Sequence, residues 1–85
     1  MRVHEIQICN DLQPQYLQEV AHQAARFSSD IKIKFDHDNL QLDVKSILGM
    51  MMIPLRSGTK ITIQTKGRDE KEAIDIMSDL LENKS

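Results

Sequence analysis

Two neighbouring segments of this chain alternate strictly between apolar and polar residues, and this alternation constrains the fold more than any other feature. Residues 31–36 read IKIKFD, and residues 40–44 read LQLDV. A period of two residues places successive side chains on opposite faces of a β-strand. Both segments are therefore predicted to be strands with one buried face. The polar turn DHDN between them (residues 36–39) predicts that they pair in an antiparallel sense.

Two further strands are predicted at the beginning and near the end of the chain. Residues 2–8 (RVHEIQI) place His4, Ile6 and Ile8 on one face. In residues 61–64 (ITIQ), isoleucines alternate with polar residues, and Gly67 closes this segment. The expected sheet therefore has four strands, each with one apolar face.

Two long amphipathic helices are predicted. The first covers residues 14–27, because proline suits the first turn of a helix and an apolar stripe follows at helical spacing, made of Leu17, Val20, Ala21, Ala24 and Ala25. The second begins after Asp69, with Glu72 placed as in a capping box. Its predicted buried stripe is Ala73, Ile74, Met77, Leu80 and Leu81.

A short apolar segment, ILGMMMIPL (residues 47–55), follows Ser46. Serine is a favoured N-cap, so a helix of one or two turns is predicted from Ile47 to about Met52, ended by Pro54. The segment holds more apolar side chains than so short a helix can bury, which indicates an adaptable, methionine-rich partner surface. A short core helix remains the alternative. A phosphate on Ser46 would face the positive end of the helix dipole, beside Lys45.

The predicted order is β-α-β-β-α-β-α, in a single domain of residues 1–85. We therefore expect an α+β open-faced sandwich, with a four-stranded antiparallel sheet and three helices on one of its faces. The other face is expected to be wet, because it carries Lys32, Lys34, Gln41, Lys60, Thr62, Gln64 and Lys66. This lysine face could bind nucleic acid, but it offers no aromatic side chain for stacking on bases.

Charge and cysteine content exclude some classes of protein. The formal net charge of −2 argues against nucleic acid or an anionic membrane as the main partner. The single cysteine, Cys9, cannot form an internal disulfide, which fits a reducing cytoplasm. No signal peptide or long apolar run is present, so we expect a cytoplasmic protein.

Residues suited to catalysis are not grouped in this sequence. His4, His22 and His37 show no metal-ligand spacing, and no Ser-His-Asp arrangement or glycine-rich phosphate loop is found. We therefore expect no enzyme activity, no metal and no cofactor. The mouth of the first helix offers free amides to an anion, yet Gln13 and Gln15 stand there, and an amide is neither nucleophile nor base.

The segment KSILGMM (residues 45–51) resembles KSIMGVM of the HPr family, the small phosphocarriers of the bacterial sugar phosphotransferase system. Residues 25–30 (ARFSSD), 58–63 (GTKITI) and 67–73 (GRDEKEA) are also similar to that family. The resemblance covers nearly the whole chain. It implies the HPr-like form of the sandwich described above.

The resemblance also implies the roles of particular residues. In HPr, the loop before the first helix reads G-I-H-A-R-P, and Gln13 takes the place of its phosphoryl-carrying histidine. Gln15 takes the place of its arginine. The motif serine, here Ser46, is the substrate of HPr kinase/phosphorylase, and the phosphorylated protein binds a LacI-type catabolite control protein. The Crh branch of the family likewise has glutamine for the histidine, so this chain is similar to Crh.

The chain departs from the Crh pattern at several positions. Asp11, Gln15 and Tyr16 do not fit the G-x-Q-A-R-P frame, the turn at residues 36–39 is longer, and Pro54 replaces a glycine. The main prediction is a non-catalytic regulatory protein of carbon catabolite control, phosphorylated at Ser46. Its partner-binding residues are predicted to be Gln15, Gln18, His22, Lys45, Ile47, Leu48, Met51, Met52 and Leu55.

Three alternatives stay open at this point. The chain could be a degenerate HPr-like binding module without phosphorylation. It could be a residual phosphocarrier that uses another residue, such as His22. It could also be a nucleic-acid-binding sandwich that uses the lysine face.

Overall fold

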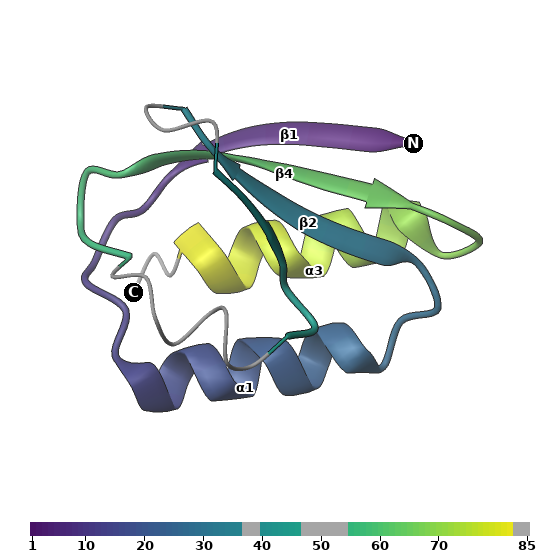
Figure 1. Cartoon of the computed structure of the whole chain (residues 1–85), viewed down its shortest axis with the longest axis horizontal. Coiled ribbons are helices and arrows are strands. Elements are labelled where there is room, and N and C mark those ends of the chain that lie inside the picture. The colour runs from purple at the N-terminus through teal and green to yellow at the C-terminus, as the bar shows by residue number, and fades with distance from the viewer. Residues whose placement is uncertain (37–39, 47–54, 83–85) are drawn as a thin grey trace.

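Four strands form one antiparallel sheet in the order β1-β4-β2-β3, and two helices cover one face of it (Figure 1). The computed structural model describes residues 1–36, 40–46 and 55–82. Its elements are β1 (Arg2–Gln7), α1 (Pro14–Ala25), β2 (Asp30–Phe35), β3 (Gln41–Asp43), β4 (Lys60–Lys66) and α3 (Glu70–Glu82). The predicted α+β sandwich with a four-stranded antiparallel sheet is confirmed. The predicted third helix, from Ile47 to Met52, lies outside the described residues, as do residues 37–39.

The core lies between the sheet and the helices, and the alternating segments supply most of it. β4 is central and places Ile61 opposite Ile6 of β1 and Ile63 opposite Ile33 of β2. The predicted buried face of the second strand, made of Ile31, Ile33 and Phe35, is confirmed. Each fully buried aliphatic side chain of this size contributes about 1.5–3 kcal/mol relative to an exposed one. The aliphatic sheet face is therefore the main source of stability.

The two described helices bury the stripes predicted for them, with three differences. Ala25 is exposed, because α1 ends there and the N–H of Phe27 bonds back to the Ala24 carbonyl oxygen at 3.1 Å. In α3, Leu80 is only half-buried, whereas Ser78 is buried. The other predicted stripe residues are buried as expected.

The third strand is shorter than predicted. Leu42 pairs with Ile33, but Leu40 lies outside β3 and is 40% exposed. The strand ends at Asp43, whose carboxylate accepts the N–H of Lys45 at 3.0 Å and so turns the chain. Val44 is fully buried although it follows the strand.

The predicted capping box, in which the Asp69 side chain caps α3 together with Glu72, is wrong, because the Asp69 side chain bonds to other residues. Asp69 precedes α3, and its carbonyl accepts the first helical bond from Ala73 at 2.9 Å. Its carboxylate, however, accepts the backbone N–H groups of Ser28 and Ser29, at 3.0 and 2.9 Å, and the Ser29 hydroxyl. This side chain therefore ties the loop after α1 to the start of α3. A sequence pattern of local spacing cannot show such a long-range partner.

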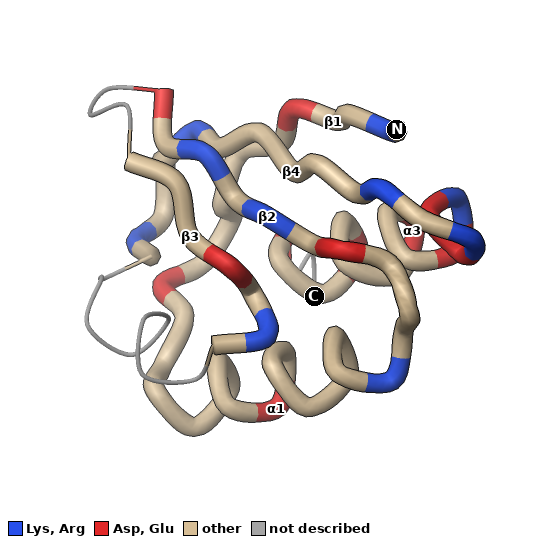
Figure 2. Tube along the Cα trace, turned by 45° about the vertical axis from the view of Figure 1, so that its right-hand side comes forward, with Lys and Arg blue, Asp and Glu red and all other residues tan. Residues whose placement is uncertain are grey.

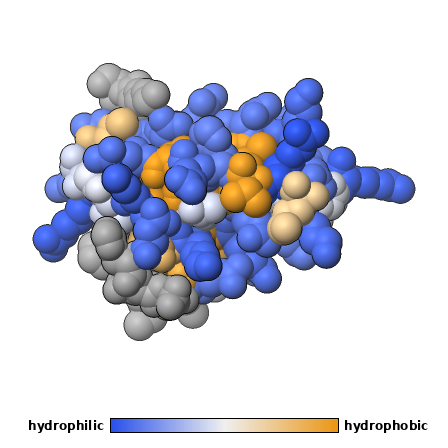
Figure 3. Space-filling view, turned by 90° about the horizontal axis from the view of Figure 1, so that it is seen from above, coloured by the Kyte–Doolittle hydropathy of each residue, from blue (hydrophilic) through white to orange (hydrophobic). Residues whose placement is uncertain are grey.

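The outer face of the sheet is polar, as predicted. Lys32 and Lys34 of β2 and Lys60 and Lys66 of β4 are exposed. Figure 2 shows the basic segments of β2 and β4 in blue. Figure 3, which looks down on this face, shows a mostly hydrophilic surface with small hydrophobic patches. Neither described helix is long and apolar enough to cross a membrane.

Candidate functional site at α1 and Ser46

The first turn of α1 has no acidic side chain and, among the described residues, no side-chain cap. Pro14 begins the helix, and Gln13 is its N-cap, with an extended backbone and no side-chain capping bond. The Gln13 and Gln15 side chains are both exposed at this end. Within the part of the chain that the structure describes, no carboxylate neutralises the positive end of the helix dipole in this turn. Gln13 and Gln15, which lie at this end of the helix, offer only side-chain amides to a phosphoryl group.

The loop before α1 is fixed by contacts with the segment that leads to β4. Leu12 pairs with Leu55 in an isolated bridge, and its N–H donates to the Leu55 carbonyl at 2.8 Å. Asp11 accepts the N–H of Ser57 at 2.7 Å, and the Ser57 hydroxyl donates to the Cys9 carbonyl at 3.1 Å. These contacts hold the helix mouth in place.

This bridge corrects one predicted partner-binding residue. Leu55 is only 2% exposed and belongs to the core, so it is not available to a partner in this structure. The sequence pattern predicts Leu55 at the surface because residues 47–55 hold more apolar side chains than a short helix can bury. The other predicted residues of that segment, Ile47, Leu48, Met51 and Met52, lie outside the described residues.

Tyr16 occupies the place of the proline in the HPr loop frame. Its hydroxyl donates to the Leu80 carbonyl of α3 at 2.5 Å, and its ring packs against the core. Burial raises the pKa of this phenol above its ordinary value. Tyr16 therefore connects the mouth of α1 to the C-terminal half of α3.

The predicted docking residues of α1 lie on its outer face. Gln15, Gln18 and His22 are all exposed, and their spacing places them on one side of the helix. His22 is in the last turn of α1, at the opposite end from Gln13. An imidazole at that place cannot use the free donors of the helix mouth.

Ser46 is exposed and follows a fixed turn. Its N–H donates to the Asp43 carbonyl at 3.0 Å. The neighbouring Lys45 is half-buried, and its ammonium donates to the carbonyl of Phe27, just beyond the C-terminal end of α1, at 2.8 Å. The structure therefore anchors Lys45 at the end of α1 that is remote from Gln13.

Two interactions near the site were not expected from the sequence. The pKa of Asp69 falls to about 2, because its carboxylate accepts bonds from the Ser29 hydroxyl and the Ser28 backbone. The pKa of Glu70 is also lowered, since the N-terminal ammonium lies 2.8 Å from it and Gly67 donates to it. Asp69 stood out in the sequence only as a helix cap.

Comparison with known proteins gives the family. A family model described as "PTS HPr component phosphorylation site" matches residues 3–83. The chain belongs to the HPr family. An HPr-like protein Crh of Halalkalibacterium halodurans is 33% identical over 92% of this chain and 90% of its own length. Crh of Bacillus subtilis is 31% identical over 84% of this chain and 81% of its own length.

A phosphocarrier protein HPr of Cupriavidus necator is 38% identical over 62% of this chain, which spans 60% of that relative. Among solved structures, HPr-C-His of Thermoanaerobacter tengcongensis has a TM-score of 0.84 at 32% identity, covering 98% of this chain and 93% of its own. HPr of Bacillus anthracis has a TM-score of 0.85 at 30% identity, covering 94% of this chain and 95% of its own. The resemblance to HPr and to Crh is thus confirmed.

The side chains of Gln13 and Ser46 differ in the phosphate chemistry that they can support. Transfer through a phosphohistidine needs an imidazole nitrogen as nucleophile, and the amide of Gln13 is not one. An exposed serine hydroxyl can accept a phosphoryl group from ATP when a kinase supplies the catalytic groups. The geometry at Ser46 meets that requirement of access.

Proposed function

We propose that this chain is a non-catalytic, Crh-like regulatory protein that HPr kinase/phosphorylase phosphorylates at Ser46, using ATP. The observation that carries the proposal has two parts. Gln13 stands at the mouth of α1, and Ser46, in a KSI-x-G motif, is exposed. The similarity to two Crh proteins supports it. The protein would act by binding other proteins in carbon catabolite regulation. A cytoplasmic location remains part of this prediction.

Phosphorylation would change the charge of one surface strongly. A phosphoserine adds about −1.5 to −2 charges at neutral pH. At Ser46 this charge would lie next to Lys45, which contacts the C-terminal end of α1, the end where His22 is exposed. A LacI-type catabolite control protein is the partner we propose for this combined surface. Because Gln15 is neutral, docking would depend more on the phosphate than on a charged residue at that position.

The residual phosphocarrier has weaker support. It would need a nucleophile other than Gln13, and His22 lies in the last turn of α1. A nucleic-acid role for the lysine face is also weaker, because the described outer-face residues of the sheet include no aromatic side chain. Passage through a heparin column at physiological salt without retention would count against that role.

The test of the proposal is phosphorylation in solution. The purified chain is incubated with HPr kinase/phosphorylase and ATP, and the modified residue is located by peptide mass spectrometry. We expect one phosphate, at Ser46, and none in Ser46→Ala. Ser28→Ala is the matched control, since Ser28 is also exposed, and it should be phosphorylated like the wild type. Without incorporation at Ser46, the chain would be an HPr-like binding module that is not switched by this kinase.

A further inference from the structure

β1 is an edge strand of the sheet, and one of its sides has no neighbouring strand in the described chain. The N–H of Ile8 donates to the Thr59 carbonyl at 2.8 Å, in continuation of the β1–β4 register. In an antiparallel ladder, backbone groups point toward and away from the partner strand alternately. Val3 and Glu5 therefore direct their N–H and C=O groups toward the open edge, as does the N–H of Gln7. Such a row of backbone groups can pair with another extended chain.

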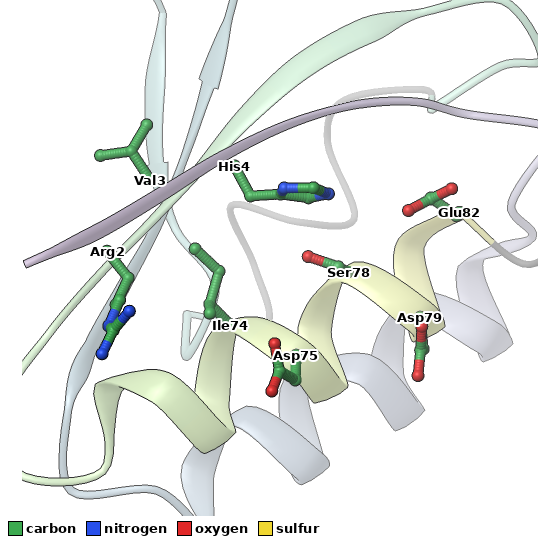
Figure 4. A pocket seen from close by; sticks show the side chains of 8 residues that line it. All are labelled: Arg2, Val3, His4, Ile74, Asp75, Ser78, Asp79 and Glu82. Atoms are coloured by element: carbon green, nitrogen blue, oxygen red, sulfur yellow. The ribbon is translucent and has the colours of Figure 1, made fainter.

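A groove of about 570 Å³ lies directly beneath this edge, between β1 and α3. Figure 4 shows Ile74 and Ser78 rising from α3 toward β1, with the ring of His4 above them. Asp75 and Asp79 lie on the near side of the same helix. The groove is therefore continuous with the open edge of the sheet.

Ser78 gives the groove a polar floor. The residue is 7% exposed, and no buried side-chain oxygen or nitrogen in the described part of the chain lacks a hydrogen-bond partner, so the hydroxyl is in contact with the groove. The hydroxyl points into the groove (Figure 4). A ligand that enters the groove can bond to this hydroxyl in place of water.

The groove is acidic. Asp75 and Asp79 are four residues apart on α3, so both carboxylates line the same side of the helix. The one arginine of the groove, Arg2, is already close to a carboxylate outside it, because its Nε lies 3.8 Å from Glu70. The carboxylates of Asp75 and Asp79 therefore favour a cationic ligand.

We propose that the open edge of β1 and this acidic groove bind an extended peptide with lysine or arginine at alternate positions, added as a fifth strand. Its backbone bonds with Val3 and Glu5. Alternate side chains enter the groove, where their alkyl stems cover Ile74 and their charged ends reach Asp75 and Asp79. The remaining side chains shield Val3, which is 57% exposed. This surface is separate from α1 and Ser46, so the proposal does not depend on the phosphorylation switch.

The test is an NMR titration of the ¹⁵N-labelled chain with a short synthetic peptide that alternates lysine and valine. We expect the amides of Val3, Glu5 and Gln7 to shift and to exchange more slowly with solvent. A peptide that alternates glutamate and valine should not bind. Equal binding of both peptides, or shifts confined to another face, would overturn the proposal.

Two pairs of variants separate the charged groove from the strand edge. Asp75→Asn with Asp79→Asn should weaken lysine-peptide binding by about fivefold, the effect of two partly exposed ion pairs. The matched control, Glu19→Gln with Glu72→Gln, removes two carboxylates elsewhere and should bind like the wild type. Equal weakening in both double variants would contradict a specific acidic groove.

Glu5→Pro removes one of the outward N–H groups and should abolish binding, whereas Glu5→Thr keeps that group and should bind like the wild type. Each variant is first checked for a native ¹⁵N spectrum. Binding by a natively folded Glu5→Pro would exclude strand addition. Sedimentation of the free chain as a dimer paired through β1 would also overturn the proposal, because a second copy would then occupy the edge.

Discussion

The Lys45 ammonium donates to the carbonyl oxygen of Phe27 at 2.8 Å, so the residue before Ser46 is fixed to the end of α1. Phe27 follows the C-cap residue Arg26, so a cation at this place complements the negative end of the helix dipole. The turn that presents Ser46 is thereby coupled to α1.

Lys45→Met removes this hydrogen bond while keeping most of the alkyl stem. We expect the free energy of unfolding to fall by about 1.5 kcal/mol, the lower end of the usual contribution of a hydrogen bond with a charged group, because Lys45 is only half-buried. Urea denaturation monitored by circular dichroism measures the change. Lys34→Met is the control, because Lys34 is exposed on β2. An equal loss in both variants would show that the contact with Phe27 contributes nothing specific.

The carboxylate of Asp69 should make stability depend on pH in the acid range. Its pKa is about 2 in the folded chain against an ordinary value of 3.8, so the folded state binds its proton less tightly than the unfolded state. The resulting stabilisation is present above about pH 4 and is lost as the pH falls toward 2. Urea midpoints measured across this window should fall in the wild type. Asp69→Asn should lack this component, and an unchanged pH profile in that variant would refute its assignment.

Gly67 and Gly58 should respond differently to alanine. Both have a positive φ, +149° and +92°, but a Cβ at Gly67 would lie 2.7 Å from the Cα of Ser29, whereas no atom lies within 4 Å at Gly58. We expect Gly58→Ala to lower the free energy of unfolding by about 1 kcal/mol and Gly67→Ala by about 2–3 kcal/mol. Thermal unfolding of the two variants compares them. A larger effect at Gly58 would be inconsistent with the close approach at Ser29.

Tyr16→Phe tests the link between α1 and α3. Removing the hydroxyl leaves the Leu80 carbonyl without its donor, and we expect a loss of about 1 kcal/mol. Tyr16 is the chain's one tyrosine, so a spectrophotometric titration reports it alone. Because burial raises its pKa, the phenol should titrate above its ordinary value of 10.0. Titration at or below that value would show that the ring is not buried against α3.

Much of the fold follows from local pattern. The alternation around Ile33 and Ile63 was sufficient to predict the strands and their buried faces, because one face of the sheet is covered and the other is wet. The exposure of Gln15, Gln18 and His22 on α1 followed from helical spacing in the same way. Such predictions succeed where a residue's environment depends on its nearest neighbours in the chain.

The errors arose where distant segments meet. Leu55 is buried because it pairs with Leu12, and Asp69 bonds to the loop after α1 instead of capping α3. The buried Ser78 beneath the open edge of β1 gave no signal of its own, since serine is ordinary on a helix. These contacts depend on tertiary packing, which residue spacing does not encode.

The central claim is that Ser46 accepts a phosphoryl group and that Gln13, at the mouth of α1, does not. The most direct measurement compares two phosphoryl donors on the intact protein: ATP with HPr kinase/phosphorylase, and phosphoenolpyruvate with Enzyme I of the phosphotransferase system. The account predicts one acid-stable phosphate from ATP, absent in Ser46→Ala, and no phosphate from phosphoenolpyruvate. Acid-labile phosphate from phosphoenolpyruvate, or an ATP-derived phosphate that persists in Ser46→Ala, would contradict it.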